Sequence, residues 1–187
     1  MEATHTVTIS NSQATVDGRR LMTTQKGSAM LTELYRDHVN DYPKFFKMDL
    51  LSRLGFIATE LLLQAEGATR YTERDDRAIV LFNHTASAQA DRTYEQTICR
   101  REQFFPSPSV FVYTLPNIVT GEIAIRNHYH GETHFFVIPT HDTQLMRRLL
   151  TPITADPLTR SAVTGWLDAP DEQHINAEIQ IIQLYGT

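Results

Sequence analysis

The period of the hydrophobic pattern changes several times along the chain, and each change predicts a new element. Residues 5–10 (HTVTIS) alternate and are rich in β-branched side chains, which predicts a strand, and Asp17 and Gly18 then mark the turn of a small hairpin. Apolar side chains three and four positions apart recur over residues 48–63, and Gly67 ends the run. They cover almost the whole circumference, so we expect a helix buried at the centre of the fold.

Short apolar runs and amphipathic stretches follow one another through the rest of the chain. Further strands are predicted at residues 77–84, 134–138, 160–169 and 177–186, and further helices at 28–39, at 89–102, after Pro116 and at 142–150, where Asp142 is the expected cap. This order predicts an α/β layered fold with a mainly parallel five-stranded sheet. We expect residues 1–187 to form one domain, since this length suffices for a single large core.

Composition narrows the classes of function. The formal net charge is −5 and the isoelectric point is near 5.9, which argues against a nucleic-acid binder that relies on a basic surface. The single cysteine, Cys99, cannot form an internal disulfide and suits a cytoplasmic location. The N-terminus lacks the pattern of a secretory signal, and the most apolar helical stretch, residues 54–65, is too short to cross a bilayer. We therefore expect neither nucleic-acid binding nor membrane insertion.

Four of the eight histidines fall within residues 127–142 (NHYHGETHFFVIPTHD), which raises the question of a metal site. On a strand, the spacing of His128 and His130 would place both imidazoles on one face, with His134 nearby and Glu132 as an oxygen donor. The segment is expected to pass from helix to loop to strand, however, so the two-residue period need not hold. Solvated or interface histidines are the alternative, and we expect no metal and no other cofactor.

No catalytic set is evident among the other reactive side chains. Cys99 is expected in the middle of a helix, away from the helix N-terminus that would stabilise a thiolate, and this favours an inert thiol. The eight glycines are scattered, so there is no Gly-rich phosphate loop, and no Gly-x-Ser-x-Gly elbow occurs.

From residue 106 onward the sequence resembles the N-terminal half of the β-ketoacyl synthases (3-oxoacyl-[acyl-carrier-protein] synthases), which assemble fatty acids and polyketides. The resemblance is carried by a PN-x-x-x-G-x-I-A-I pattern and a later glycine, which correspond here to Pro116, Asn117, Gly121 and Gly131. It extends over roughly residues 5–170 and is greatest to ketosynthase-like proteins of aryl-polyene-type and flexirubin-type lipid assembly. It implies a layered α/β/α half of a thiolase-like fold.

The resemblance also implies that the chain is noncatalytic on its own. In active members a nucleophilic cysteine follows the strand that corresponds to residues 134–138, at the start of a buried helix. Thr140 or His141 occupies that region here, so the resemblance assigns no catalytic residue. Two further catalytic histidines of the family belong to its second half, and none of the histidines here matches them.

In the family, the same strand lies at the dimer seam, where two sheets join edge to edge. The resemblance therefore implies a dimer interface at His134, Phe135, Phe136, Val137 and Ile138, and an uncovered apolar edge strand needs a partner on physical grounds. We expect a homodimer or a heterodimer with a full-length ketosynthase, with an acyl carrier protein as a further partner.

The leading hypothesis is an accessory or chain-length-type subunit of fatty-acid or polyketide biosynthesis, of the aryl-polyene type. Three alternatives stay open at this stage. The first is an acyl-transfer or acyl-hydrolysis enzyme that uses Thr140 and His141. The second is a metal-binding protein that uses His128, His130 and His134, and the third is a purely structural domain.

Overall fold

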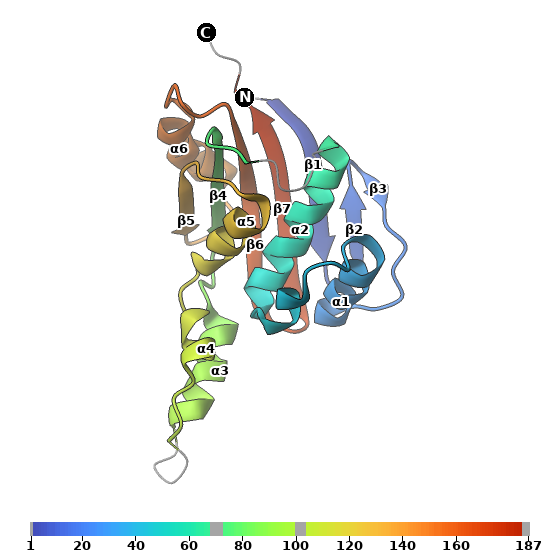
Figure 1. Ribbon diagram of the computed structural model, residues 1–187, viewed down its shortest axis with the longest axis vertical. Coiled ribbons are helices and arrows are strands. Elements are labelled where there is room, and N and C mark those ends of the chain that lie inside the picture. The colour runs from blue at the N-terminus through green and yellow to red at the C-terminus, as the bar shows by residue number, and fades with distance from the viewer. Residues whose placement is uncertain (1, 68–72, 100–103, 185–187) are drawn as a thin grey trace.

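A seven-stranded sheet with helices on both faces forms the body of the protein, as the computed structural model in Figure 1 shows; it describes residues 2–67, 73–99 and 104–184. The strands are β1 (Glu2–Ser10), β2 (Gln13–Val16), β3 (Arg19–Arg20), β4 (Arg77–Asn83), β5 (Thr133–Val137), β6 (Ser161–Asp171) and β7 (His174–Gln183). The helices are α1 (Gly27–His38), α2 (Leu50–Glu66), α3 (Ala88–Ile98), α4 (Pro108–Val112), α5 (Ile118–Asn127) and α6 (Thr143–Thr154), with a short 3-10 helix at Pro43–Lys47.

The strand order is β3-β2-β1-β7-β6-β4-β5. β4 runs parallel to its two neighbours, β5 and β6, and the remaining pairings of the described strands are antiparallel. The prediction of a mainly parallel five-stranded sheet is therefore wrong, whereas the α/β class is confirmed. Residues 11–12 connect β1 to β2 and residues 172–173 connect β6 to β7. Connections of two residues permit only antiparallel neighbours, which explains the mixed sheet.

Helices cover the two faces of the sheet unequally. α1, α2 and α5 lie on one face, and α6 lies on the other face against β4 and β6 (Figure 1). This arrangement confirms the expected α/β/α layers. α2 buries thirteen of its seventeen residues, so the predicted central helix is also confirmed. Within the described ranges, no helix is both long enough and apolar enough to cross a membrane.

β4 contributes to the apolar core on both sides of the sheet, and all seven of its residues are buried. Because side chains alternate along a strand, Ile79 and Leu81 join the cluster beneath α2, while Val80 and Phe82 join the cluster beneath α6. The nearly continuous apolar sequence of this strand is explained by that double coverage.

A buried ion pair ties the start of β4 to the end of α2. The Arg77 side chain is fully buried, and its Nη1 and Nη2 atoms donate to Glu66 at 2.7 and 2.5 Å, while Nε donates to Ser161 of β6 at 2.9 Å. Burial raises the pKa of Glu66, but the hydrogen bonds and charge of Arg77 outweigh it and hold that pKa below its ordinary value of 4.5. The pair therefore stabilises the fold fully above pH 4.5, and this stabilisation is lost as the pH falls through the folded-state pKa.

A second buried arginine holds α5 against α2. Arg126 of α5 is almost fully buried, and its Nε lies 3.2 Å from the carboxylate of Glu60 in α2. Its Nη2 donates to Asp41 at 2.6 Å, and its guanidinium carbon lies 4.8 Å from the centre of the Tyr42 ring. These contacts hold α5 against α2, and α5 also packs against β5, the last strand of the sheet.

Replacing Arg77 by methionine leaves the Glu66 carboxylate without its arginine. Because that side chain keeps 18% of its surface exposed, we expect the lower end of the cost of breaking a buried pair, about 3 kcal/mol of unfolding free energy at pH 7. Denaturant titration followed by circular dichroism measures the loss. The control variant Arg77→Met/Glu66→Leu removes both charges and should regain at least half of it. A single-variant loss below about 1 kcal/mol would contradict this role for the pair.

Candidate functional site

The predicted interface segment forms the last strand of the sheet. β5 pairs with β4 along one side, and in the described part of the chain no strand lies along its other side. Four of the predicted interface residues, His134 to Val137, lie within β5, and Ile138 follows it. The strand begins one residue earlier than predicted, at Thr133.

The backbone of β5 presents a regular set of outward-facing groups. The Ile138 N–H donates to the Asn83 carbonyl and the Glu132 carbonyl accepts from the Ile79 N–H, both at 2.8 Å. Even-numbered residues of the strand therefore face β4. Since alternate residues of a strand direct their N–H and C=O groups to opposite sides, Thr133, Phe135 and Val137 direct theirs away from the sheet. Such a row is a template for adding another strand.

The side chains of β5 do little to discourage pairing. Phe135 packs against the α2 side of the core, and the Phe136 ring stacks on Phe82 at 5.3 Å on the opposite face. Val137 is 51% exposed. The strand sequence THFFV contains no proline, lysine or acidic residue, which are the usual devices that protect a free edge.

The structure does not bring His128, His130 and His134 together. His128 ends α5 in a left-handed conformation with φ of 54°. The Nδ1 atom of His130 lies 3.1 Å from an Asp75 carboxylate oxygen, whereas Nε2 of His134 lies 3.1 Å from a Glu132 oxygen. Each of the latter two imidazoles thus pairs with a different carboxylate, and the three histidines of the metal-binding alternative do not converge on one point.

A different trio could in principle offer ligands to a cation. Single donor atoms of Glu73, Asp75 and His130 lie within 4.8 Å of one another, and all three side chains are exposed. Carboxylates beside an exposed histidine also occur as ordinary solvated ion pairs without a metal. Such exposed pairs contribute little stability in water. Nothing further in the described residues points to a metal there.

The loop that would hold a nucleophile connects β5 to α6. As predicted, Asp142 caps α6, since its carboxylate accepts from the N–H groups of Gln144 and Leu145 at 2.9 and 3.0 Å. Thr140 and His141 precede it and are exposed, and the His141 ring stacks on Trp166 at 4.7 Å. No hydrogen bond between the Thr140 hydroxyl and the His141 imidazole occurs among the described contacts. The nucleophile and base of the enzymatic alternative are therefore not joined.

A hollow of about 430 Å³ adjoins this loop, between α6 and the face of the sheet on which α6 lies. Thr6, Thr8, Glu178 and Gln180 form its polar floor on β1 and β7. His141, Met146, Arg147 and Leu150 form the wall on the α6 side. Sequence reasoning did not find this hollow, although the alternation of β1 and β7 already places polar side chains on one sheet face.

The motif residues of the resemblance have separate structural roles. Asn117 is the N-cap of α5, and its carbonyl accepts from the Thr120 N–H at 3.1 Å; Pro116 precedes it in the turn. A side chain at Gly131 would overlap the Arg77 carbonyl, so the loop before β5 needs glycine there. A side chain at Gly121 would meet open space, so this glycine is not required by a close approach of another element.

Sequence reasoning also missed a surface formed by the connection from β4 to β5. Part of this connection leaves the body of the fold as an arm, defined here as residues 88–99 and 104–115, in which α3 and α4 lie side by side (Figure 1). Residues 104–121 contain no charged residue, although 21% of the whole chain is charged, and this was the available signal. Cys99 lies at the end of α3 and is exposed, rather than in the middle of a helix as predicted.

Comparison with known proteins finds likeness in structure alone. No family model and no curated protein matches the chain. Among solved structures, the ishigamide ketosynthase/chain length factor superposes with a TM-score of 0.69 at 12% identity, over 97% of this chain and 61% of that chain. The ketosynthase ApeO in complex with its chain length factor ApeC, from Xenorhabdus doucetiae, gives 0.65 at 14% identity, over 98% and 79%. A β-ketoacyl synthase from Burkholderia phymatum gives 0.58 at 15% identity, over 79% and 46%.

These likenesses define the fold. It is the thiolase-like fold of ketosynthases and chain length factors, which confirms the fold expected from the resemblance of residues 5–170. The chain spans 61% of the length of the first of these structures and about half of the length of the third.

The stacking of His141 on Trp166 can be tested through the only tryptophan of the chain, which is 5% exposed. We expect His141→Ala to increase acrylamide quenching of Trp166, to shift its emission to longer wavelength, and to lower the unfolding free energy by about 1 kcal/mol. His130→Ala, which removes an exposed imidazole from the loop before β5 rather than the loop after it, is the control. Unchanged quenching in His141→Ala would show that the loop before α6 is placed differently.

Proposed function

We propose that residues 1–187 form one ketosynthase-like domain that acts as a noncatalytic accessory subunit, of the chain-length type, in fatty-acid or polyketide assembly. The aryl-polyene type is the system that the sequence resemblance favours. In this proposal the protein pairs through β5 with a full-length ketosynthase in the cytoplasm. An acyl carrier protein is a further partner, because the resemblance implies chains that grow on that carrier.

The observation that carries the proposal is the free edge of β5. Thr133, Phe135 and Val137 turn unpaired backbone groups outward on an apolar strand that has no protecting charge or proline. Two of the similar structures are, by their titles, a ketosynthase/chain length factor and a ketosynthase in complex with its chain length factor. A shared fold together with a free edge supports a partner of the same fold.

The absence of a suitable nucleophile supports a noncatalytic role. The sole cysteine, Cys99, lies at the end of α3, whereas the family places its cysteine at the start of the helix that corresponds to α6. Thr140 and His141 lie before that helix instead. A threonine hydroxyl needs a dedicated base to act as a nucleophile near neutral pH, and no such hydrogen bond is described for Thr140.

The outward-facing groups also permit self-pairing. They are arranged symmetrically about Phe135, so an antiparallel second copy would place Thr133 opposite Val137 and Phe135 opposite itself. We favour the heterodimer, since it would supply the catalytic residues that this chain lacks. A homodimer is the competing outcome of the first test below.

Co-expression of the tagged chain with each full-length ketosynthase of its source organism tests the partner. We expect one of them to form a one-to-one complex in size-exclusion chromatography. In the paired state an aspartate on β5 would lie next to the partner strand without an opposite charge to pair with. Val137→Asp should therefore weaken the complex about tenfold or more. Leu158→Asp is the control, because Leu158 is 75% exposed elsewhere on the surface. A complex that Val137→Asp leaves intact, or one that contains only this chain, would contradict the proposal.

The enzymatic alternative makes a separate prediction about acyl thioesters. We expect the isolated chain to hydrolyse or transfer acyl groups from an acyl-pantetheine thioester no faster than its Thr140→Ala variant, as measured by chromatography of the released thiol. Chromatography is preferred to a thiol reagent because Cys99 is exposed. Turnover by the wild-type chain that disappears in both Thr140→Ala and His141→Ala would favour the enzyme instead.

A further inference from the structure

The arm carries a concentration of apolar side chains that the fold itself does not use. α3 buries only Ala90, and α4 buries no residue. Ten large apolar side chains are exposed in the described chain, and seven of them lie within residues 104–137. These seven are Phe104, Phe105, Phe111, Val112, Leu115, Ile125 and Val137.

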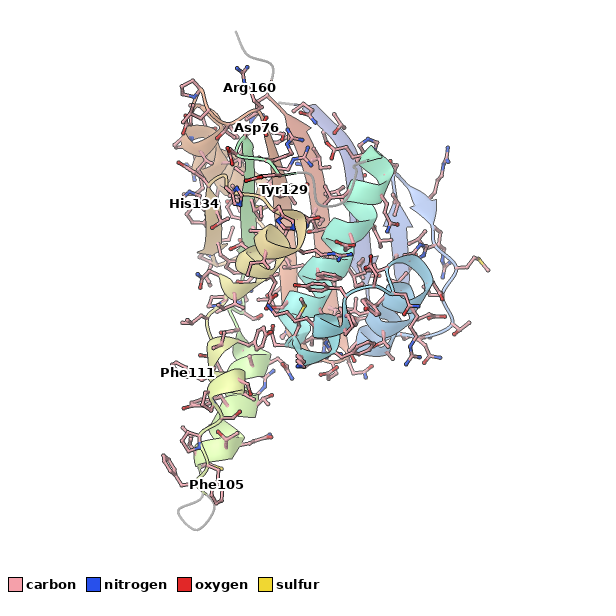
Figure 2. All side chains as sticks on the ribbon, viewed as in Figure 1. Asp76, Phe105, Phe111, Tyr129, His134 and Arg160 are labelled. Atoms are coloured by element: carbon pink, nitrogen blue, oxygen red, sulfur yellow. The ribbon has the colours of Figure 1, made fainter. Side chains whose placement is uncertain are left out.

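These side chains lie on segments that follow one another along the chain: the arm, α5 and β5. In Figure 2, Phe105 lies near the far end of the arm, Phe111 lies halfway along it, and His134 marks β5 above them. Ile125 of α5, which is 63% exposed, comes between the arm and the strand in the chain, and α5 packs against β5. The exposed apolar side chains of the arm and of β5 are thus linked through α5, which packs against β5.

The arm is held in a fixed direction by polar contacts at its base. The Ser87 hydroxyl donates to the Thr114 carbonyl, and an Arg92 guanidinium nitrogen donates to the Pro170 carbonyl at the end of β6. Tyr113 donates to the buried Glu122 of α5 at 3.1 Å, and the same carboxylate lies 2.7 Å from Lys44 Nζ. A surface that is ordered before binding loses less entropy when a partner is bound.

β5 alone is too small to form a stable protein–protein interface. Its five residues span about 17 Å, whereas a stable interface buries about 800 Å² on each partner and involves about 20–30 residues a side. Interface cores are also poor in charged side chains and rich in aromatic ones. Residues 104–121 combine both properties, since they include three phenylalanines and one tyrosine and no charged residue.

We propose that the arm forms the second part of the interface, and that its phenylalanine-bearing surface lies against the same ketosynthase subunit that pairs with β5. The inference rests on the proposed function and names the surface that the partner must offer. That surface is an edge strand continued by an apolar groove that receives residues 104–115. The arm reaches beyond the sheet, so the groove lies away from the edge of the partner sheet.

Cys99 allows the arm to be tested directly, because it is the only cysteine and is exposed at the end of α3. In the purified ketosynthase complex, a benzophenone-maleimide label on Cys99 should crosslink to the ketosynthase on irradiation. A Cys99→Ser/Met22→Cys chain, labelled on the opposite side of the fold, should not. Met22 is 91% exposed, so the label should not disturb folding there.

Substitution gives the matching affinity measurement. Phe104→Asp/Phe105→Asp should weaken the complex roughly tenfold or more, as expected when aromatic anchors are removed. Met22→Asp/Leu158→Asp changes two exposed apolar residues elsewhere and should stay within about twofold. Circular dichroism and thermal unfolding of the free chains should match the wild type, because all four side chains are more than half exposed.

The outcomes separate the two proposals. A Cys99 crosslink together with weakened binding of Phe104→Asp/Phe105→Asp supports the arm. Weakening by Val137→Asp alone, with neither a crosslink nor an effect of the arm variant, overturns the arm and leaves the pairing of β5 in place. If no ketosynthase of the host binds the wild-type chain, both proposals are overturned.

Discussion

The architecture depends on β4, a strand that is buried on both faces and along both edges. Its side chains enter two cores at once, so it can lie only inside the sheet, and the Arg77–Glu66 pair fixes its start against α2. Both neighbours of β4 run parallel to it. Parallel neighbours cannot be joined by a tight turn, so the chain must cross over between them. The crossover from β4 to β5 includes α3, α4 and α5, and the arm is an extension of this obligatory connection.

The sequence pattern gave reliable predictions wherever one physical signal dominated. α2 is apolar almost all round and is buried almost all round, and Asp142 caps α6 because its position before an amphipathic stretch leaves few alternatives. The prediction of a mainly parallel sheet was wrong, because a continuous apolar run indicates that both faces of a strand are covered but does not indicate strand direction. Two of the tight connections, Asn11-Ser12 and Glu172-Gln173, lack the Asn-Gly or Asp-Gly signature that reveals a hairpin, whereas Asp17-Gly18 between β2 and β3 carries it as predicted.

The candidate site was less accessible to sequence reasoning, for a physical reason. That residues 134–138 lie at an edge came from the family resemblance, because local pattern cannot tell an edge strand from an internal one. The histidines do not converge on one metal, because His130 lies in the loop before β5, His134 lies within β5, and each pairs with a separate carboxylate. Exposed phenylalanines such as Phe105 resemble core residues in sequence, and only the fold shows that no core lies next to them.

The free edge and the arm have a consequence for the amount of this protein that a cell can maintain. An unprotected apolar strand beside exposed aromatic side chains is the kind of surface that chaperones and proteases detect, and that promotes aggregation when left uncovered. If the proposed ketosynthase partner covers this surface, a chain synthesised in excess over that partner would be degraded or would aggregate. The steady-state amount of this protein would then be set by the abundance of the subunit that covers β5, whatever the rate of its own synthesis.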